Sequence, residues 1–265
     1  GSNPPLATIF IETVIKKNLK KIFKTITYGF FFKIYGRINE SIKNINDSRI
    51  KVEIINIEKY LKYKIYSISS GRLYTDRIQD AAAILDNKVI EGPSFQWRHT
   101  NDRKIYNSNI KENIIFSKGT PRFMKKLEGK VLSLLTGGGG NDNYVHWLFD
   151  VLPRLGLYSK KHSLDEINYF LLPSLEKKFQ KETLDYLNIP IKKRLSSEKY
   201  RHIKAREIIF TDHPVVVTGD ASEDNQKIPT WIMSWLKESF VKNNLTDKDN
   251  KKIYIDRGES TSGHK

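Results

Sequence analysis

The chain of 265 residues contains no cysteine. This absence excludes a disulfide framework and any zinc or iron–sulfur site built on thiolates, and it suits a reducing compartment such as the cytoplasm. No apolar run approaches the ~20 residues of a membrane-spanning helix, and no cleavable signal peptide opens the chain. The six histidines do not follow zinc-site spacing. We therefore expect a cytoplasmic protein without a bound metal.

Several motifs that indicate a specific reaction are also missing. The chain has no G-x-G-x-x-G loop followed by a well-placed acidic residue, which argues against a nicotinamide cofactor. It has no P-loop, because the GK[ST] ending is absent, and no G-x-S-x-G sequence to anchor a serine hydrolase triad. Signatures of nucleic-acid-binding modules are absent as well, so no nucleic-acid partner is expected.

Acidic residues are comparatively few. The chain has 46 Lys and Arg against 30 Asp and Glu, which gives a net charge of +16. A charge of this size suggests an anionic partner, such as an anionic membrane face or a phosphorylated substrate. The alternative is codon bias in an AT-rich genome, which would enrich Lys, Ile and Asn without any functional meaning.

Residues 6–38 combine an apolar stripe with a lysine-rich face, and residues 1–40 hold seven Lys and Arg but only two Glu. The stripe consists of Ile11, Ile15, Leu19, Ile22, Ile26 and Phe30, and the opposite face carries Lys16, Lys17, Lys20, Lys21 and Lys24. This pattern predicts a basic amphipathic helix. Such a helix could lie on an anionic bilayer, with the protein peripheral on the inner membrane face. Alternatively, its stripe packs on the domain that follows.

The remainder predicts an α/β fold. Residues 50–118 are mostly β, with strands at Tyr63–Ser69 and Arg72–Thr75 and a hairpin that turns at Asp86-Asn87. From Val131 onward strands alternate with helices, which is typical of βαβ units and a parallel sheet. The expected strands are 131–135, 169–173, 207–211 and 252–255, and the expected helices are 141–157, 176–187 and 228–242.

The domain organisation follows from these elements. Residues 1–40 form the helical segment and residues 41–243 form an α/β lobe. Residues 243–251, NNLTDKDNK, are polar, rich in turn formers and without apolar periodicity, which is typical of a linker. We therefore expect residues 244–265 to hold a linker and the first strand of a second lobe that is only begun.

A run of four glycines, Gly137, Gly138, Gly139 and Gly140, separates the strand that starts at Val131 from the next helix. Asn141, Asp142 and Asn143 are suitable N-cap residues for that helix. Glycines permit close approach to a ligand, which favours binding of an anion or a sugar. Ligands of open parallel sheets bind beyond the carboxyl ends of the strands. The polar residues expected at this edge, besides the loop, are Ser174, Asp212, His213, Asp256 and Arg257.

The helix after the glycines places His146, Asp150 and Arg154 on one face, at i, i+4 and i+8. Asp150 could orient the His146 imidazole and raise its basicity. Alternatively, Asp150 acts itself or forms an ion pair with Arg154. Pro153 removes one backbone hydrogen bond and predicts a kink just after Asp150.

Residues 143–155, NYVHWLFDVLPRL, resemble the NYYHWLLDxLPRL signature of glycosyltransferase family 61, whose members are often labelled capsular polysaccharide biosynthesis proteins. Residues 252–257, KIYIDR, are similar to the YxSR segment of that family, with Asp256 in place of the usual Ser. The spacing between the two segments also fits, as does GPSFQW at residues 92–97.

The resemblance implies a GT-B fold, in which two Rossmann-like lobes enclose the active site. It also implies inverting, metal-independent transfer from a nucleotide sugar to a glycan or lipid-linked acceptor, without a cofactor, in bacterial surface polysaccharide synthesis. His146 or Asp150 would be the base, Arg257 a donor-phosphate contact, and the glycine loop, Asn143, Arg154, Asp212 and His213 part of the acceptor-side wall. The alternative from a different class is a non-catalytic module that binds anionic glycan or a membrane surface.

Overall fold

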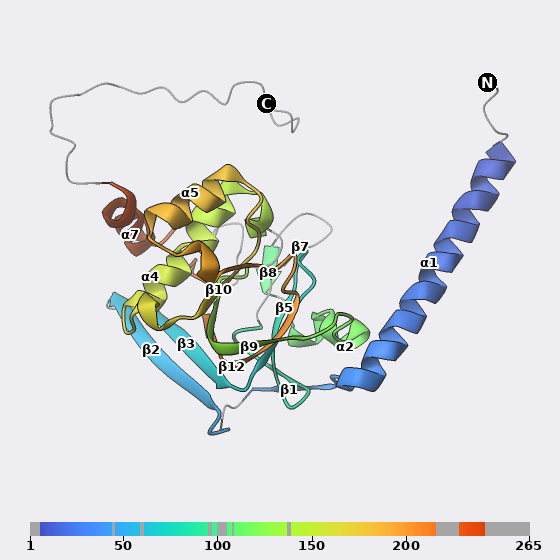
Figure 1. Ribbon diagram of the computed structural model, residues 1–265, viewed down its shortest axis with the longest axis horizontal. Coiled ribbons are helices and arrows are strands. Elements are labelled where there is room, and N and C mark those ends of the chain that lie inside the picture. The colour runs from blue at the N-terminus through green and yellow to red at the C-terminus, as the bar shows by residue number, and fades with distance from the viewer. Residues whose placement is uncertain are drawn as a thin grey trace.

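The computed structural model describes residues 6–43, 46–58, 61–94, 97–99, 105–107, 109–136, 139–215 and 228–241. Within these ranges the chain forms an α/β body around a mixed ten-stranded sheet, from which the long helix α1 extends away (Figure 1). The main path through the sheet is β1-β6-β5-β4-β12-β9-β10-β11, and β2 joins through β3, which pairs with β12. The predicted α/β class is confirmed, and the predicted N-terminal β-rich portion belongs to the same mixed sheet as the parallel strands.

One half of the sheet is parallel. Its strands are β9 (Lys125–Ser133), β10 (Tyr169–Leu172), β11 (Arg194–Ser196) and β12 (His202–Thr211), in the spatial order β12-β9-β10-β11. From β9 the chain moves outward to β10 and β11, and then returns to the other side of β9 as β12. The connection therefore changes direction between β9 and β12, which makes their carboxyl ends a topological switch point, the place where open α/β sheets bind ligands.

The other half is antiparallel. Strands β3 (Leu61–Ser69) and β4 (Arg72–Thr75) both pair with β12, at its carboxyl and amino halves respectively. The remaining strands extend this half: β2 (Ile50–Glu58), β5 (Ala81–Leu85), β6 (Lys88–Ile90) and β1 (Glu40–Ile42), which is parallel to β6. The predicted Asp86-Asn87 turn is confirmed, and both residues have positive φ, as a tight hairpin turn requires.

Three helices pack on one face of the sheet. They are α4 (Pro153–Ser159), α5 (Lys178–Tyr186) and α7 (Thr230–Phe240), and their apolar residues share one core cluster with strand residues such as Leu132 and Phe170. Strand residues that point the other way, such as Val131 and Leu171, belong to a second cluster on the opposite face. Alternating strand side chains thus bury both faces of β9 and β10, as a central parallel strand requires.

Helix α1 (Leu6–Tyr35) is attached to the body only through its last turns. Phe31 is buried against Phe123, and the Tyr35 hydroxyl accepts a hydrogen bond from the Met124 amide at 2.9 Å. The large apolar side chains nearer its start are exposed: Val14, Ile15, Leu19, Ile22, Phe23, Ile26 and Phe30. From Ile15 to Ile26 the stripe therefore does not pack on the domain that follows, whereas Phe30 contacts Phe123. No described helix is long and apolar enough to cross a membrane.

Several elements differ from the sequence predictions. Strands β9 and β12 begin earlier than predicted, and β11 and β1 were not predicted. Strands β7 (Trp97–His99) and β8 (Ile105–Asn107) form a separate two-stranded antiparallel sheet. The predicted linker and the strand at residues 252–255 lie outside the described residues, as does Arg257.

Candidate functional site

The helix that follows the glycine loop begins as predicted, at an asparagine cap. The Asn143 side chain accepts hydrogen bonds from the amides of Val145 and His146, at 2.9 and 3.3 Å, and helix α3 (Tyr144–His146) starts there. The next turn, Trp147–Val151, is π-helical, with the Leu152 amide bonded to the Trp147 carbonyl at 3.0 Å. The predicted kink before Pro153 therefore takes the form of a π turn, a feature often found at functional sites.

His146 and Asp150 form a close pair across this turn. Nδ1 of His146 lies 2.6 Å from Oδ2 of Asp150. The carboxylate is buried and the imidazole is partly exposed, with side-chain exposures of 8% and 42%. The hydrogen bond to Asp150 raises the pKa of His146, and partial burial opposes that rise. Among the described residues, Nε2 of His146 has no hydrogen-bond partner, so this nitrogen is the one that can exchange a proton with a ligand.

A second imidazole approaches the same carboxylate from the end of β12. Nε2 of His213 lies 3.8 Å from Oδ1 of Asp150, and Nδ1 of His213 is 3.2 Å from the Val215 carbonyl oxygen. Burial lowers the pKa of His213 to about 4. At neutral pH His213 is therefore an uncharged neighbour of Asp150, whereas His146 is the imidazole whose basicity the carboxylate increases.

Arg154 fixes the helix to the end of β12. It is buried, and its Nε donates to the Asp150 carbonyl oxygen at 2.9 Å while Nη1 donates to the Thr211 carbonyl oxygen at 3.1 Å. Burial lowers its pKa to about 10, so the guanidinium remains charged at neutral pH. Its hydrogen bonds go to two backbone carbonyls. The ion pair with the Asp150 carboxylate, one of the predicted alternatives, is not formed.

The described part of the glycine loop, Gly139 and Gly140, is packed closely on its neighbours. A Cβ atom on Gly139 would lie 3.0 Å from Cγ and Cδ2 of His146, and one on Gly140 would lie 2.7 Å from Val151. Neither glycine has a positive φ, so the reason for glycine at these positions is the lack of space for a Cβ atom. The buried Gln180 amide donates to the carbonyl oxygens of Gly140 and Asn141, at 3.2 and 2.8 Å. Gly137 and Gly138 lie outside the described residues.

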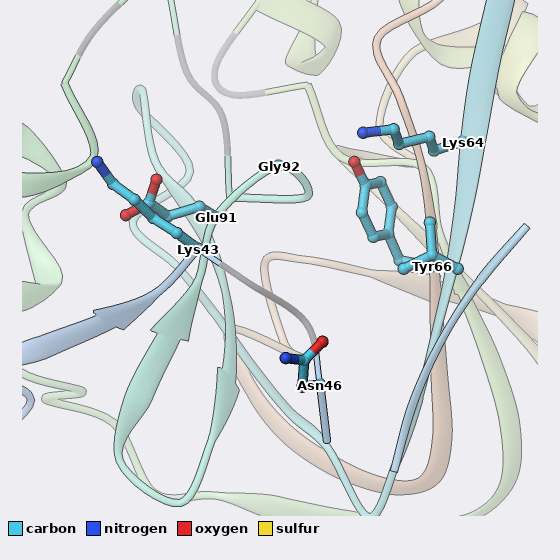
Figure 2. Close-up of a pocket in the computed structure, with 7 residues that line it drawn as sticks. Lys43, Asn46, Lys64, Tyr66, Glu91 and Gly92 are labelled. Atoms are coloured by element: carbon cyan, nitrogen blue, oxygen red, sulfur yellow. The ribbon is translucent and has the colours of Figure 1, made fainter. Parts of the chain in front are cut away.

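Asp212 faces a different direction from His213. Its carboxylate accepts hydrogen bonds from the Tyr66 hydroxyl at 3.2 Å and from the Lys64 amide at 2.8 Å, and burial raises its pKa. Tyr66 and Lys64 form one wall of an open cavity of about 600 Å³, and Lys43 and Glu91 lie across from them (Figure 2). Asp212 therefore links the wall of this cavity to the end of β12. His213, the next residue, is the one that approaches Asp150.

The structure thus brings together four of the predicted side chains, His146, Asp150, Arg154 and His213, at the switch point between β9 and β12. Sequence reasoning did not identify Tyr66 or Gln180. A buried glutamine in an amphipathic helix is a detectable signal, because such a side chain needs polar partners. Within the described ranges, no three His, Cys, Asp or Glu side chains form a group that could hold a metal ion.

The chain matches no protein-family model, no curated protein and no solved structure. Its function is therefore argued from the geometry of the site and from the sequence resemblance.

Proposed function

We propose that the protein is an inverting glycosyltransferase in which His146 is the general base and Asp150 orients it. One observation carries this proposal: an imidazole paired with a buried carboxylate presents an unpaired Nε2 at the topological switch point of the parallel strands. A hydrogen bond to a carboxylate fixes the tautomer of the imidazole and raises its basicity, which is what a general base requires.

In this reaction Nε2 of His146 takes the proton of an acceptor hydroxyl. The hydroxyl oxygen attacks C1 of the donor sugar while the bond from C1 to the departing diphosphate oxygen breaks, so the configuration at C1 inverts. The Asp150 carboxylate stabilises the imidazolium that forms. His213 and Arg154 act as positioning residues, because His213 flanks the carboxylate and Arg154 holds the backbone at both Asp150 and Thr211.

The substrate class rests on the resemblance to glycosyltransferase family 61. NYVHWLFDVLPRL contains both His146 and Asp150, and their pairing gives the motif a chemical purpose. The nucleotide-sugar donor, a GT-B arrangement of two lobes and a donor-phosphate contact from Arg257 are parts of this proposal. So are a glycan or lipid-linked acceptor and a cytoplasmic location at the inner membrane face.

The test is sugar-nucleotide turnover by the full-length natural protein, measured over a panel of nucleotide sugars. Loss of a general base typically costs ~10²–10⁴-fold in rate, so His146→Ala should lose turnover by that factor, and Asp150→Asn should lose a substantial part of it. His162→Ala is the matched control, since His162 is paired with Glu53 at 2.5 Å, away from the switch point. Wild-type rates in both site variants would disprove the assignment.

A specific observation favours a second candidate function, binding to an anionic membrane surface. The apolar stripe of α1 is exposed: Leu19, Ile22 and Ile26 are 61, 57 and 67% accessible. The surplus of lysines on this helix would attract anionic headgroups when the stripe enters the interface.

Liposome co-sedimentation tests this candidate. Ile22→Glu/Ile26→Glu should abolish binding to anionic vesicles without loss of fold, because both side chains are exposed. Asn18→Glu/Thr25→Glu introduces the same charge on the same helix from polar, exposed positions, and it should retain most of the binding. Equal losses in the two variants would show that only net charge matters and would exclude insertion of the stripe.

A further inference from the structure

A second cavity, of about 280 Å³, lies where α1 meets the body, away from the candidate site. Its lining comes from four separate parts of the chain: α1, β4 with the segment after it, the segment around residues 114–122, and Arg201 just before β12. Four of the lining side chains are cationic and one is acidic. The cations are Lys24, Lys118, Arg122 and Arg201, and the acid is Asp76.

The surrounding protein neutralises the positive charge of this cavity only in part. Within the described part of the chain, none of the four cationic side chains forms an ion pair. One oxygen of Asp76 accepts three backbone N–H bonds, from Ile78, Gln79 and Asp80, each at 2.9 Å. That oxygen is thereby committed to its own turn, and the single negative charge of Asp76 leaves a surplus of positive charge in the lining.

Arg201 is one of the cationic residues that are held close together at this cavity. Its guanidinium is held by the carbonyl oxygens of Thr75 and Asp76, at 3.2 and 2.9 Å, so it stays at the cavity wall. Burial lowers the pKa of Arg201, and the charge of nearby Arg122 also lowers it, whereas Tyr74 and Asp76 act in the opposite direction. Two guanidinium groups at one cavity repel each other unless an anion lies between them.

We propose that this cavity binds a phosphate group, as a phosphate monoester or a diphosphate. Arginine guanidinium groups donate paired hydrogen bonds to phosphate oxygens, and lysines add point charges. The Tyr28 side chain, which also lines the cavity, adds a hydroxyl that can donate to the same group. The volume suits a phosphate or diphosphate with a small part of the molecule that carries it. The proposal is independent of the transfer reaction at His146.

The helix geometry indicates one source for the phosphate. Lys20, Lys24, Phe31 and Tyr35 lie on one face of α1 by their spacing, and Phe31 and Tyr35 are the residues that attach the helix to the body. The exposed stripe therefore points away from the body. If that stripe lies on a membrane, the cavity opens close to the headgroup layer, where a phospholipid monoester is available. A soluble phosphorylated compound is the other source.

The experiment measures binding of pyrophosphate to the whole protein by calorimetry, together with co-sedimentation on phosphatidylcholine vesicles. The vesicles contain either phosphatidate, a monoester, or phosphatidylglycerol at equal surface charge. The test variant is Lys118→Gln/Arg122→Gln. The matched control is Lys160→Gln/Lys161→Gln, which removes the same charge from two exposed lysines at the end of α4. Thermal melts establish that both variants are folded.

Pyrophosphate should bind the wild type and the control alike, and at least about tenfold more weakly to the test variant, because two charge-assisted contacts are lost. A preference for phosphatidate vesicles that disappears in the test variant identifies a lipid source. Pyrophosphate binding without that preference identifies a soluble source and equally supports the phosphate site. If test and control variants bind pyrophosphate equally, the proposal is wrong. His146→Ala should leave pyrophosphate binding at this cavity unchanged, which separates the two sites.

Discussion

Nε2 of His213 lies 3.8 Å from Oδ1 of Asp150, although the two residues are 63 positions apart in the sequence. The other carboxylate oxygen is 2.6 Å from Nδ1 of His146. One carboxylate thus serves two imidazoles whose pKa values shift in opposite directions. The hydrogen bond raises the pKa of His146, whereas burial lowers the pKa of His213 to about 4. Two imidazoles that contact one carboxylate but differ in pKa are suited to different roles.

The first prediction concerns the titration of these two histidines. NMR of the imidazole Cε1–H signals should show His146 titrating above its ordinary value of 6.5 and His213 remaining neutral down to about 4. In Asp150→Asn the pKa of His146 should fall, because the acceptor that raises it loses its charge. An unchanged His146 pKa in that variant would contradict the pairing.

The second prediction contrasts two adjacent glycines. Gly139→Ala places a methyl group 3.0 Å from the His146 ring, so the ring must move and turnover should fall with little loss of stability. Gly140→Ala meets Val151 at 2.7 Å and Pro173 at 2.9 Å, both in the packed interior, and should reduce the free energy of unfolding by ~1–3 kcal/mol. Urea unfolding and initial rates, measured on both variants, check this. A larger stability loss for Gly139→Ala would refute it.

Local signals in the sequence predicted much of this site. Asn143 is an N-cap residue, and it caps the helix. The spacing of His146 and Asp150 at i and i+4 predicts their contact, which forms. The run 169–173 predicts a strand that becomes β10, Tyr169–Leu172. These predictions succeeded because each depends on residues close together in the chain, where helix and strand periodicity decide which side chains meet.

The remaining features depend on tertiary contacts. The i, i+8 spacing of His146 and Arg154 assumed a regular helix, but the π turn at Trp147–Val151 adds a residue, and Arg154 contacts backbone carbonyls. Strand β11 has three residues, too few for any period to be recognised. The Tyr66–Asp212 hydrogen bond joins residues 146 positions apart, through antiparallel pairing of β3 with β12 that no local pattern indicates.

The third prediction concerns acid stability. His202 is buried as a neutral imidazole, with Nδ1 2.9 Å from the Arg122 carbonyl oxygen and Nε2 accepting from Arg72, and burial lowers its pKa to about 4. Since the unfolded state binds a proton below about 6.5 and the folded state does not, stability is fully present above that pH. It falls as the pH drops from 6.5 towards 4, by up to about 3 kcal/mol for this group.

His202→Gln provides the comparison, because glutamine retains a donor and an acceptor but does not titrate. Urea unfolding of both proteins across this pH range should show a smaller decline in the variant. The decline that remains would come from His213, which shifts in the same direction, and, towards pH 4, from carboxylates whose pKa is lowered by a charged partner, such as Glu53. His146 contributes with the opposite sign: its raised pKa stabilises the fold below about 6.5, and that contribution is lost as the pH rises through its folded value. Parallel curves for wild type and variant would exclude His202 as the cause.

The fourth prediction concerns Gln180, whose buried amide holds the glycine loop through the carbonyl oxygens of Gly140 and Asn141. Gln180→Leu leaves those carbonyls unpaired and should cost ~1–3 kcal/mol. Gln180→Glu should cost more at neutral pH, ~3–5 kcal/mol, because a buried carboxylate then faces two carbonyl oxygens. Burial raises the pKa of the introduced carboxyl, so the excess over Gln180→Leu should shrink as acid protonates it and restores one donor. Urea unfolding at neutral and acidic pH decides the matter, and a constant difference between the variants would show that the side chain does not face these carbonyls.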